Sequence, residues 1–128
     1  MIIALTLFSC SNKRERRDKN VGFYKIDTIK TNFNSYSSSD YKELTLYFHD
    51  DGTFKFSFNV PFIYDSIGTW EVGSDELYEL NYIKYRSNDG FRDQFYQCCD
   101  SDSTILLNSI TPKKNKEPIS KIYFRKVF

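Results

Sequence analysis

Few residue types in this sequence could carry out chemistry, and they are not arranged to do so. The single histidine, His49, precedes Asp50 and Asp51, and one imidazole excludes a metal site built from several histidines. We interpret His49 as an exposed residue beside a turn rather than as a catalytic base. The sequence has no Gly-x-Ser-x-Gly motif, no glycine-rich phosphate loop and no EF-hand spacing. It therefore predicts a protein that is not an enzyme and that uses no metal and no cofactor.

The adjacent cysteines Cys98 and Cys99 lie in the stretch 91–99, which reads FRDQFYQCC. Neighbouring residues on a strand point to opposite faces of the sheet, so this pair cannot clamp one metal ion. A disulfide between them would strain the ring that it closes, because ordinary bridges join Cα atoms about 4.4–6.8 Å apart. We therefore expect one thiol to be buried and the other to be exposed.

Cys10 separates an apolar segment from a strongly charged one. Residues 2–8 read IIALTLF, which is far shorter than the ~20 residues of a membrane-spanning helix but has the length of a signal-peptide core. No Lys or Arg precedes this run, so we interpret residues 1–9 as a signal peptide truncated at its start. The alternative is a chance apolar segment of a cytosolic protein. Residues 10–20 then form a polar tether that is too charged to join a core.

The tetrapeptide Leu7-Phe8-Ser9-Cys10 resembles a bacterial lipobox, with Leu three residues before the cysteine and a small residue directly before it. The resemblance implies that the Cys10 thiol receives a diacylglycerol, that the chain is cut before Cys10 and that the new amine is acylated. Ser11, in place of Asp, resembles an outer-membrane sorting signal. We therefore expect a lipid-anchored protein of the outer membrane that faces the periplasm or the cell surface.

Charge is unevenly distributed along the chain, although the net charge is only +1. Residues 11–20 and 113–126 are basic, whereas residues 31–112 hold thirteen acids and five bases. A nucleic-acid-binding domain is more uniformly basic, so nucleic acid is excluded as a partner. The two basic ends suit an approach to anionic lipid headgroups; the alternative for the C-terminal cluster is solvated charge that keeps the protein soluble.

Period-two alternation dominates the chain from residue 21 onward. In YKELTLYFHD the apolar positions are 44, 46 and 48, and in TFKFSFNV they are 54, 56, 58 and 60. The Asp51-Gly52 pair between these two segments predicts a hairpin. Segment 31–40 is the one sizeable loop, with room for a short helix. Further strands are expected at 21–29, 67–72, 76–85, 91–99, 104–110 and 119–128, with turns at 73–75, 88–90, 100–103 and 112–118.

Short hairpins joining about eight strands predict an all-β fold: an antiparallel up-and-down barrel over residues 21–128, with a β-sandwich as the alternative. The segments FHDDGTFKF, GTWEVGSDELYEL and IYFRKV resemble the small lipocalin-like lipoproteins of the Bacteroidota. The resemblance covers most of residues 21–128 and implies a lipocalin-like barrel in the cell envelope. Gly22-Phe23-Tyr24 lacks the tryptophan that lipocalins carry on the first strand.

Two functional hypotheses follow, and both describe a cell-envelope lipoprotein with a binding role. In the first, the barrel holds a small apolar or amphipathic ligand. Its rim or lining would include rings that carry a polar tip, namely Tyr64, Trp70, Tyr78 and Tyr82. In the second, the twelve phenylalanines help to fill the interior, and the loops and outer tyrosines of a packed scaffold bind another envelope protein. The volume of an enclosed cavity separates the two hypotheses.

Overall fold

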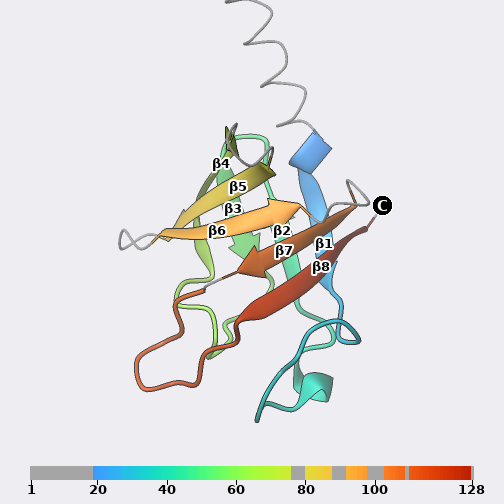
Figure 1. Cartoon of the computed structure of the whole chain (residues 1–128), viewed down its shortest axis with the longest axis vertical. Coiled ribbons are helices and arrows are strands. Elements are labelled where there is room, and N and C mark those ends of the chain that lie inside the picture. Colours follow the sequence, from blue (N-terminus) through green and yellow to red (C-terminus); the bar gives the residue numbers. More distant parts are fainter. Residues whose placement is uncertain (1–18, 76–79, 88–91, 98–102, 109, 128) are drawn as a thin grey trace, which may run out of the picture.

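The computed structural model describes residues 19–75, 80–87, 92–97, 103–108 and 110–127. Within these residues the chain forms eight strands and one short 3-10 helix, η1, and Figure 1 shows their arrangement. The strands are β1 (Gly22–Ile26), β2 (Thr45–Phe48), β3 (Thr53–Phe56), β4 (Ile67–Asp75), β5 (Leu80–Ser87), β6 (Arg92–Gln97), β7 (Thr104–Asn108) and β8 (Lys121–Val127), and η1 spans Ser38–Asp40 between β1 and β2.

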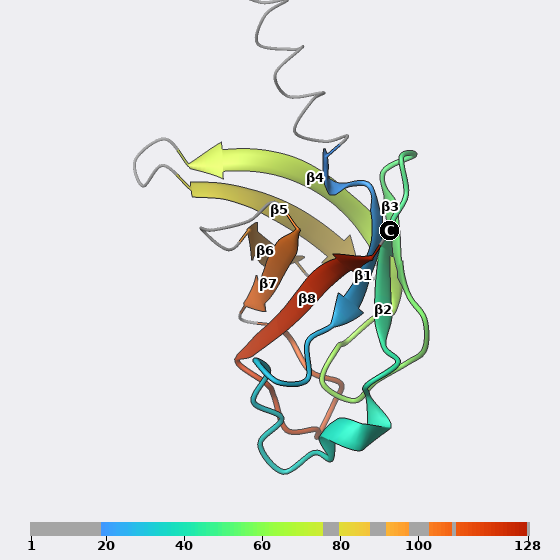
Figure 2. The same ribbon diagram turned by 90° about the vertical axis from the view of Figure 1, so that its right-hand side faces the viewer.

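The eight strands form one closed, up-and-down barrel. Each strand pairs antiparallel with the next along the chain, and β8 returns to pair with β1, where Phe23 lies opposite Val127. Figure 2 looks at this closing seam, with β8, β1 and β2 side by side. The all-β barrel predicted from the alternation is confirmed, and the β-sandwich alternative is wrong, because closure of the single sheet leaves no second sheet to stack.

The hairpin of β2 and β3 forms as its sequence predicts. Leu46 lies opposite Phe56 and Phe48 opposite Phe54, and all four side chains are buried, while the residues between them are half-buried or exposed. Gly52 has a φ of 89°, a left-handed conformation that glycine adopts without steric cost, and its N–H donates to the His49 carbonyl. The turn therefore depends on Gly52.

Several strand bounds differ from the expectation: β1, for example, ends at Ile26 rather than at residue 29. Two of the differences change which residues the sheet buries or pairs. β3 ends at Phe56, and the chain then leaves the sheet, so Phe58 is 38% exposed rather than buried beside Phe54 and Phe56. Residues 73–75, expected as a turn, continue β4 and pair with residues 80–82 of β5. The expected turns at 88–90 and 100–102 and the Cys98–Cys99 pair lie outside the described residues.

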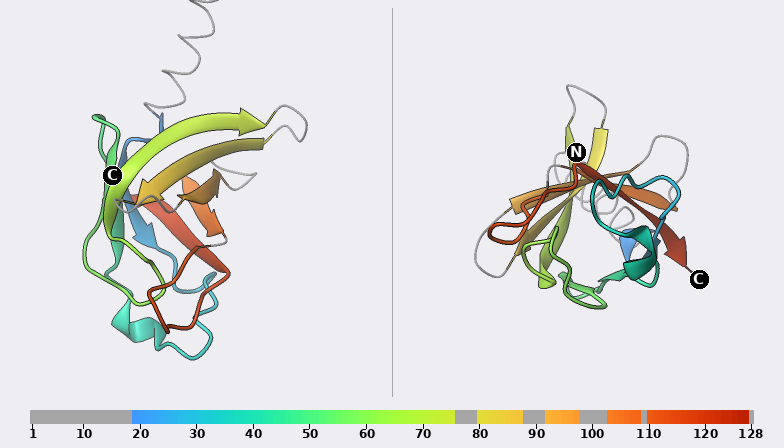
Figure 3. Two further views of the ribbon diagram at one scale, coloured as in Figure 1. Left: turned by 90° about the vertical axis from the view of Figure 1, so that its left-hand side faces the viewer. Right: turned by 90° about the horizontal axis from the view of Figure 1, so that it is seen from below.

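Three of the connections that the structure describes gather at the end of the barrel opposite the β2–β3 turn: residues 27–44, 57–66 and 110–120. We call this end the loop end, and the right-hand view of Figure 3 looks onto it. Backbone bonds join the second and third connections, from Tyr64 N–H to the Thr111 carbonyl (2.9 Å) and from Lys113 N–H to the Pro61 carbonyl (2.9 Å). The Tyr36 hydroxyl joins the first to the third by donating to the Glu117 carbonyl (2.7 Å). The connections thus hold one another in place.

Candidate functional site

The interior of the barrel is the first candidate site, and side chains fill it. Rings from three strands that are not neighbours meet there: Phe56 of β3 lies 6.1 Å from Phe124 of β8 and 6.4 Å from Tyr85 of β5, between ring centroids. Phe54 adds an edge-to-face contact with Tyr85 at 4.1 Å. Because rings from strands two and three positions apart around the barrel touch, the described part of the interior is a packed core. The largest of its fully buried side chains are Tyr24, Tyr85, Phe48, Phe54, Phe56, Phe62, Phe124, Leu44, Leu46, Ile63 and Ile83.

An aromatic cluster closes the loop end of the barrel. Phe62, from the connection between β3 and β4, is fully buried and packs against Tyr41 (4.9 Å), Tyr36 (5.4 Å) and Phe33 (6.3 Å) of the first connection. Burial, together with the neighbouring negative charge of Asp40 and the nearby Tyr36, raises the pKa of Tyr41 above its ordinary value. The Tyr41 hydroxyl therefore stays protonated at physiological pH, so Tyr41 adds no negative charge to the cluster.

Trp70 packs inside the opposite end of the barrel, where β2 turns into β3. Its side chain is 5% exposed, and its ring lies 4.9 Å from the ring of Phe48. The indole Nε1–H donates to the backbone carbonyl of His49 at 2.9 Å, which satisfies the polar atom of a buried ring. His49 directly precedes the β2–β3 turn, as expected, but it is half-buried rather than exposed, with its ring 3.8 Å from that of Tyr47.

The residues proposed from the sequence as a ligand lining do not gather in the described structure. Tyr64 is half-buried at the loop end, whereas Trp70 lies at the other end of the barrel. Tyr82 lies on β5 opposite Gly73 and Tyr96, and its side chain is outside the described structure. Tyr78 and the proposed lipid-attachment residue Cys10 also lie outside the described residues. Their roles stay predictions.

A hollow of about 310 Å³ lies on the β4–β5 hairpin, which extends from the barrel in Figures 2 and 3. Thr69, Glu71 and Arg86 in its lining are exposed and Lys84 is half-buried, so the hollow opens to solvent. Thr69 lies opposite Arg86, and Glu71 opposite Lys84. Alternation along each strand places these side chains outward, but it does not give the register that brings them together. The described lining consists of Thr69, Trp70, Glu71, Lys84, Tyr85 and Arg86.

No three described His, Cys, Asp or Glu side chains lie close enough together to hold a metal ion. The described residues also contain no helix with the length and apolar character needed to span a bilayer. Comparison with protein-family models, curated proteins and solved structures finds no match. The resemblance to lipocalin-like lipoproteins therefore stays a prediction from the sequence motifs.

Proposed function

We propose that the protein is a lipid-anchored, non-enzymatic protein of the cell envelope whose barrel is a packed scaffold that binds another envelope protein. The filled interior carries this proposal. Phe56, Tyr85 and Phe124 come from three separate strands and meet in the interior of the barrel, in space that an enclosed ligand would need. A ligand of ordinary size needs about 300 Å³ or more of enclosed space. Binding by the outer surface is therefore favoured over binding inside the barrel.

The loop end offers a surface suited to binding a protein. Its three connections are joined by hydrogen bonds, including one from the Asn34 amide to the Pro118 carbonyl (3.2 Å) and one from the Ser35 hydroxyl to the Glu117 carboxylate. A surface that is already ordered loses little conformational entropy when a partner binds. The half-buried Tyr36 and Tyr41 contribute amphipathic rings of the kind enriched in interfaces.

Attachment through Cys10 is the second part of the proposal, and it is supported by the lipobox resemblance alone. Acylation of the thiol and of the new amine would place several chains in the bilayer, which gives stable anchoring where a single chain does not. Residues 11–18 would then connect the lipid to the barrel over at most about 30 Å when fully extended. The barrel would stay close to the membrane surface.

A small amphipathic ligand is the second candidate, favoured by the hollow of about 310 Å³ on β4 and β5. Lys84 and Arg86 in its lining offer positive charge to an anionic group. The polar and exposed character of Thr69, Glu71 and Arg86 makes this a shallow site rather than an enclosed one. It ranks second for that reason.

Native mass spectrometry of the protein purified from the membranes of its own host tests both candidates together. We expect a chain that begins at Cys10, carries the mass of a diacylglycerol and a fatty acid, and binds a stoichiometric protein partner. A Cys10→Ser variant is the matched control and should lose the lipid mass. An intact Met1 with a free Cys10 thiol would refute the anchor. A retained small molecule without a protein partner would favour the second candidate instead.

A further inference from the structure

Five outward-facing residues form a continuous row across five neighbouring strands. Phe23 of β1 lies opposite both Val127 of β8 and Tyr47 of β2. Lys55 of β3 lies opposite both Tyr47 and Ile67 of β4. Directly opposed residues on one face of an antiparallel sheet have adjacent side chains. We call Val127, Phe23, Tyr47, Lys55 and Ile67 the outer row.

Most of the outer row is apolar and open to solvent. Phe23 is 50% exposed, Val127 46% and Ile67 43%, and these are three of the five large hydrophobic side chains exposed in the described residues. The solvent face of an antiparallel sheet is ordinarily polar, and contiguous exposed apolar residues mark interaction surfaces. Cross-strand pairing explains the contact of Phe23 with Tyr47, but it leaves half of the Phe23 side chain in water.

The aromatic rings of the outer row pack against one another. The rings of Phe23 and Tyr47 are stacked with centroids 4.0 Å apart and planes 7° apart, and the ring of His49 lies 3.8 Å beyond Tyr47. Each ring thus fixes the orientation of its neighbour. A surface held in this way needs no rearrangement before it makes contact.

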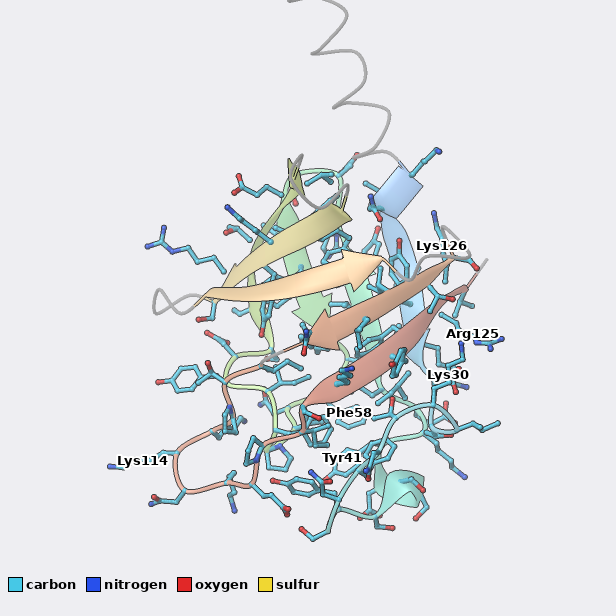
Figure 4. The ribbon with its side chains drawn as sticks, viewed as in Figure 1. Lys30, Tyr41, Phe58, Lys114, Arg125 and Lys126 are labelled. Carbon is cyan, nitrogen blue, oxygen red and sulfur yellow. The ribbon has the colours of Figure 1, made fainter. Side chains whose placement is uncertain are left out.

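Cations lie beside the outer row on β1, β3 and β8. Lys25 of β1 lies opposite Arg125 of β8, two residues along from the pair of Phe23 and Val127. Lys55 belongs to the row itself. Figure 4 shows Lys126, Arg125 and Lys30 along the same edge of the molecule, and the Lys126 Nζ donates to the Lys19 carbonyl at 2.8 Å.

The carboxylates near the outer row offset only part of this charge. Asp27 has a side chain that is 9% exposed and is bonded to Arg125, and Glu43 lies 3.7 Å from the Lys25 Nζ. Asp50 and Asp51 lie in the β2–β3 turn beyond His49. A fifth carboxylate, that of Asp65, accepts a hydrogen bond from the Ile67 N–H (3.4 Å). Against these five carboxylates stand Lys19, Lys25, Lys30, Lys55, Arg125 and Lys126.

We infer that the outer row is a membrane-contacting surface that lies on an anionic bilayer. Phe23, Val127 and Ile67 insert at the boundary between headgroups and acyl chains, Tyr47 lies at the headgroup level, and the surrounding cations bind lipid phosphates. The inference rests on the proposed lipid anchor only for the proximity of the bilayer. Its effect is to hold the barrel in one orientation, so that β1, β2 and β8 face the membrane.

Two observations favour a bilayer over a second copy of the chain. Three half-exposed apolar side chains and one ring offer roughly 300 Å² of contact, whereas a stable dimer buries about 800 Å² on each partner. In addition, Phe23 and Tyr47 each lie one residue from a strand end, and Val127 is the last residue of β8, at the end of the barrel where the chain arrives from residue 19. Phe23 follows Cys10 by only thirteen residues, or at most about 45 Å of extended chain.

Co-sedimentation with lipid vesicles tests the inference. The full chain carrying Cys10→Ser is mixed with vesicles of equal parts phosphatidylethanolamine and phosphatidylglycerol, and separately with vesicles of phosphatidylcholine alone. We expect binding to the anionic vesicles to weaken about tenfold in Phe23→Ser, because an inserted apolar side chain is lost. Lys55→Gln should weaken it about fivefold, with little effect on the neutral vesicles.

Matched controls come from outside the outer row. Phe58→Ser removes another exposed phenylalanine, and Lys114→Gln removes a lysine of the loop end, so both should bind vesicles as the Cys10→Ser parent does. Val127→Ser provides a second apolar variant should Phe23→Ser lose its far-ultraviolet circular dichroism spectrum. Because every protein in the series shares the same N-terminal segment, differences between variants report on the row alone.

Several outcomes would overturn the inference. Equal binding of Phe23→Ser, Val127→Ser and the parent would show that the row does not touch the bilayer. A dimer in sedimentation velocity that dissociates in Phe23→Ser would assign the row to a second copy. Neither result bears on acylation of Cys10, which is read from the mass of the host-purified protein.

Discussion

Asp27 joins the first connection to β8, beside the pair of strands, β1 and β8, that closes the barrel. Its carboxylate accepts hydrogen bonds from the N–H groups of Ile29 (3.0 Å) and Lys30 (3.1 Å) and from the Arg125 Nε (3.0 Å). Burial by itself would raise the pKa of Asp27. The two backbone donors and the Arg125 guanidinium outweigh burial, so the pKa lies below its ordinary value. The first connection is thereby tied to β8.

The lowered pKa of Asp27 makes the free energy of unfolding fall in acid. Because the folded pKa of Asp27 is depressed, its contribution is present above the unfolded value of about 3.9 and is lost as the pH falls through the folded pKa. Asp27→Asn should lower the free energy of unfolding at neutral pH by about 2 kcal/mol. It should also flatten the decline of that free energy below about pH 4, measured by urea denaturation at a series of pH values.

Glu43→Gln is the control for Asp27, because its carboxylate is 72% exposed and lies 3.7 Å from Lys25. We expect it to change the free energy of unfolding by less than about 0.5 kcal/mol at neutral pH. If Asp27→Asn and the parent lose stability with the same slope in acid, the account of Asp27 is wrong.

At the scale of elements, alternation and turn residues predicted the β2–β3 hairpin but not the bounds of its neighbours. Residues 73–75 read Gly-Ser-Asp, a composition typical of turns, yet they pair with residues 80–82 and continue β4. Phe58 continues the alternation of Phe54 and Phe56, yet the chain turns away after Phe56 toward the loop end. Both differences arise from pairing with distant segments, which local patterns do not encode.

The outer row and the hollow on β4 and β5 also could not be predicted from the sequence, because both depend on the pairing of distant segments. Alternation places Phe23, Tyr47 and Ile67 on outward faces, but their adjacency requires the register of four strand pairs. The closing pair of β1 and β8 joins residues about 100 positions apart, as in Phe23 opposite Val127. Trp70 was predicted from the sequence as a ligand-lining residue, and its role stays a prediction; its indole N–H donates to the His49 carbonyl.

Gly68 gives an element-scale prediction, because it sets how closely β3, β4 and β5 approach. A Cβ at position 68 would overlap the backbone carbonyl of Arg86 and the ring of Phe54, which face it from the two neighbouring strands. Gly68→Ala should therefore lower the free energy of unfolding by about 2–3 kcal/mol. Thr69→Ala, an exposed neighbour, should change it by less than about 0.5 kcal/mol. Equal urea midpoints for the two variants would contradict this packing.

At the scale of the whole molecule, the barrel is a closed sheet, and side chains fill the part of its interior that the structure describes. Phe56 is central to this core, because its ring contacts rings from β3, β5 and β8. Phe56→Ala should lower the free energy of unfolding by about 3–5 kcal/mol and leave an apolar cavity. The two ends of the barrel are closed differently, by the aromatic cluster around Phe62 and by Trp70.

Crystallography under xenon pressure tests the filled interior most directly, because xenon enters dry apolar cavities and marks them. The account predicts no xenon site within the barrel of the parent protein and one site in Phe56→Ala, at the position of the missing ring. A xenon atom bound between Phe56, Tyr85 and Phe124 in the parent would show a hollow barrel and would contradict the packed scaffold.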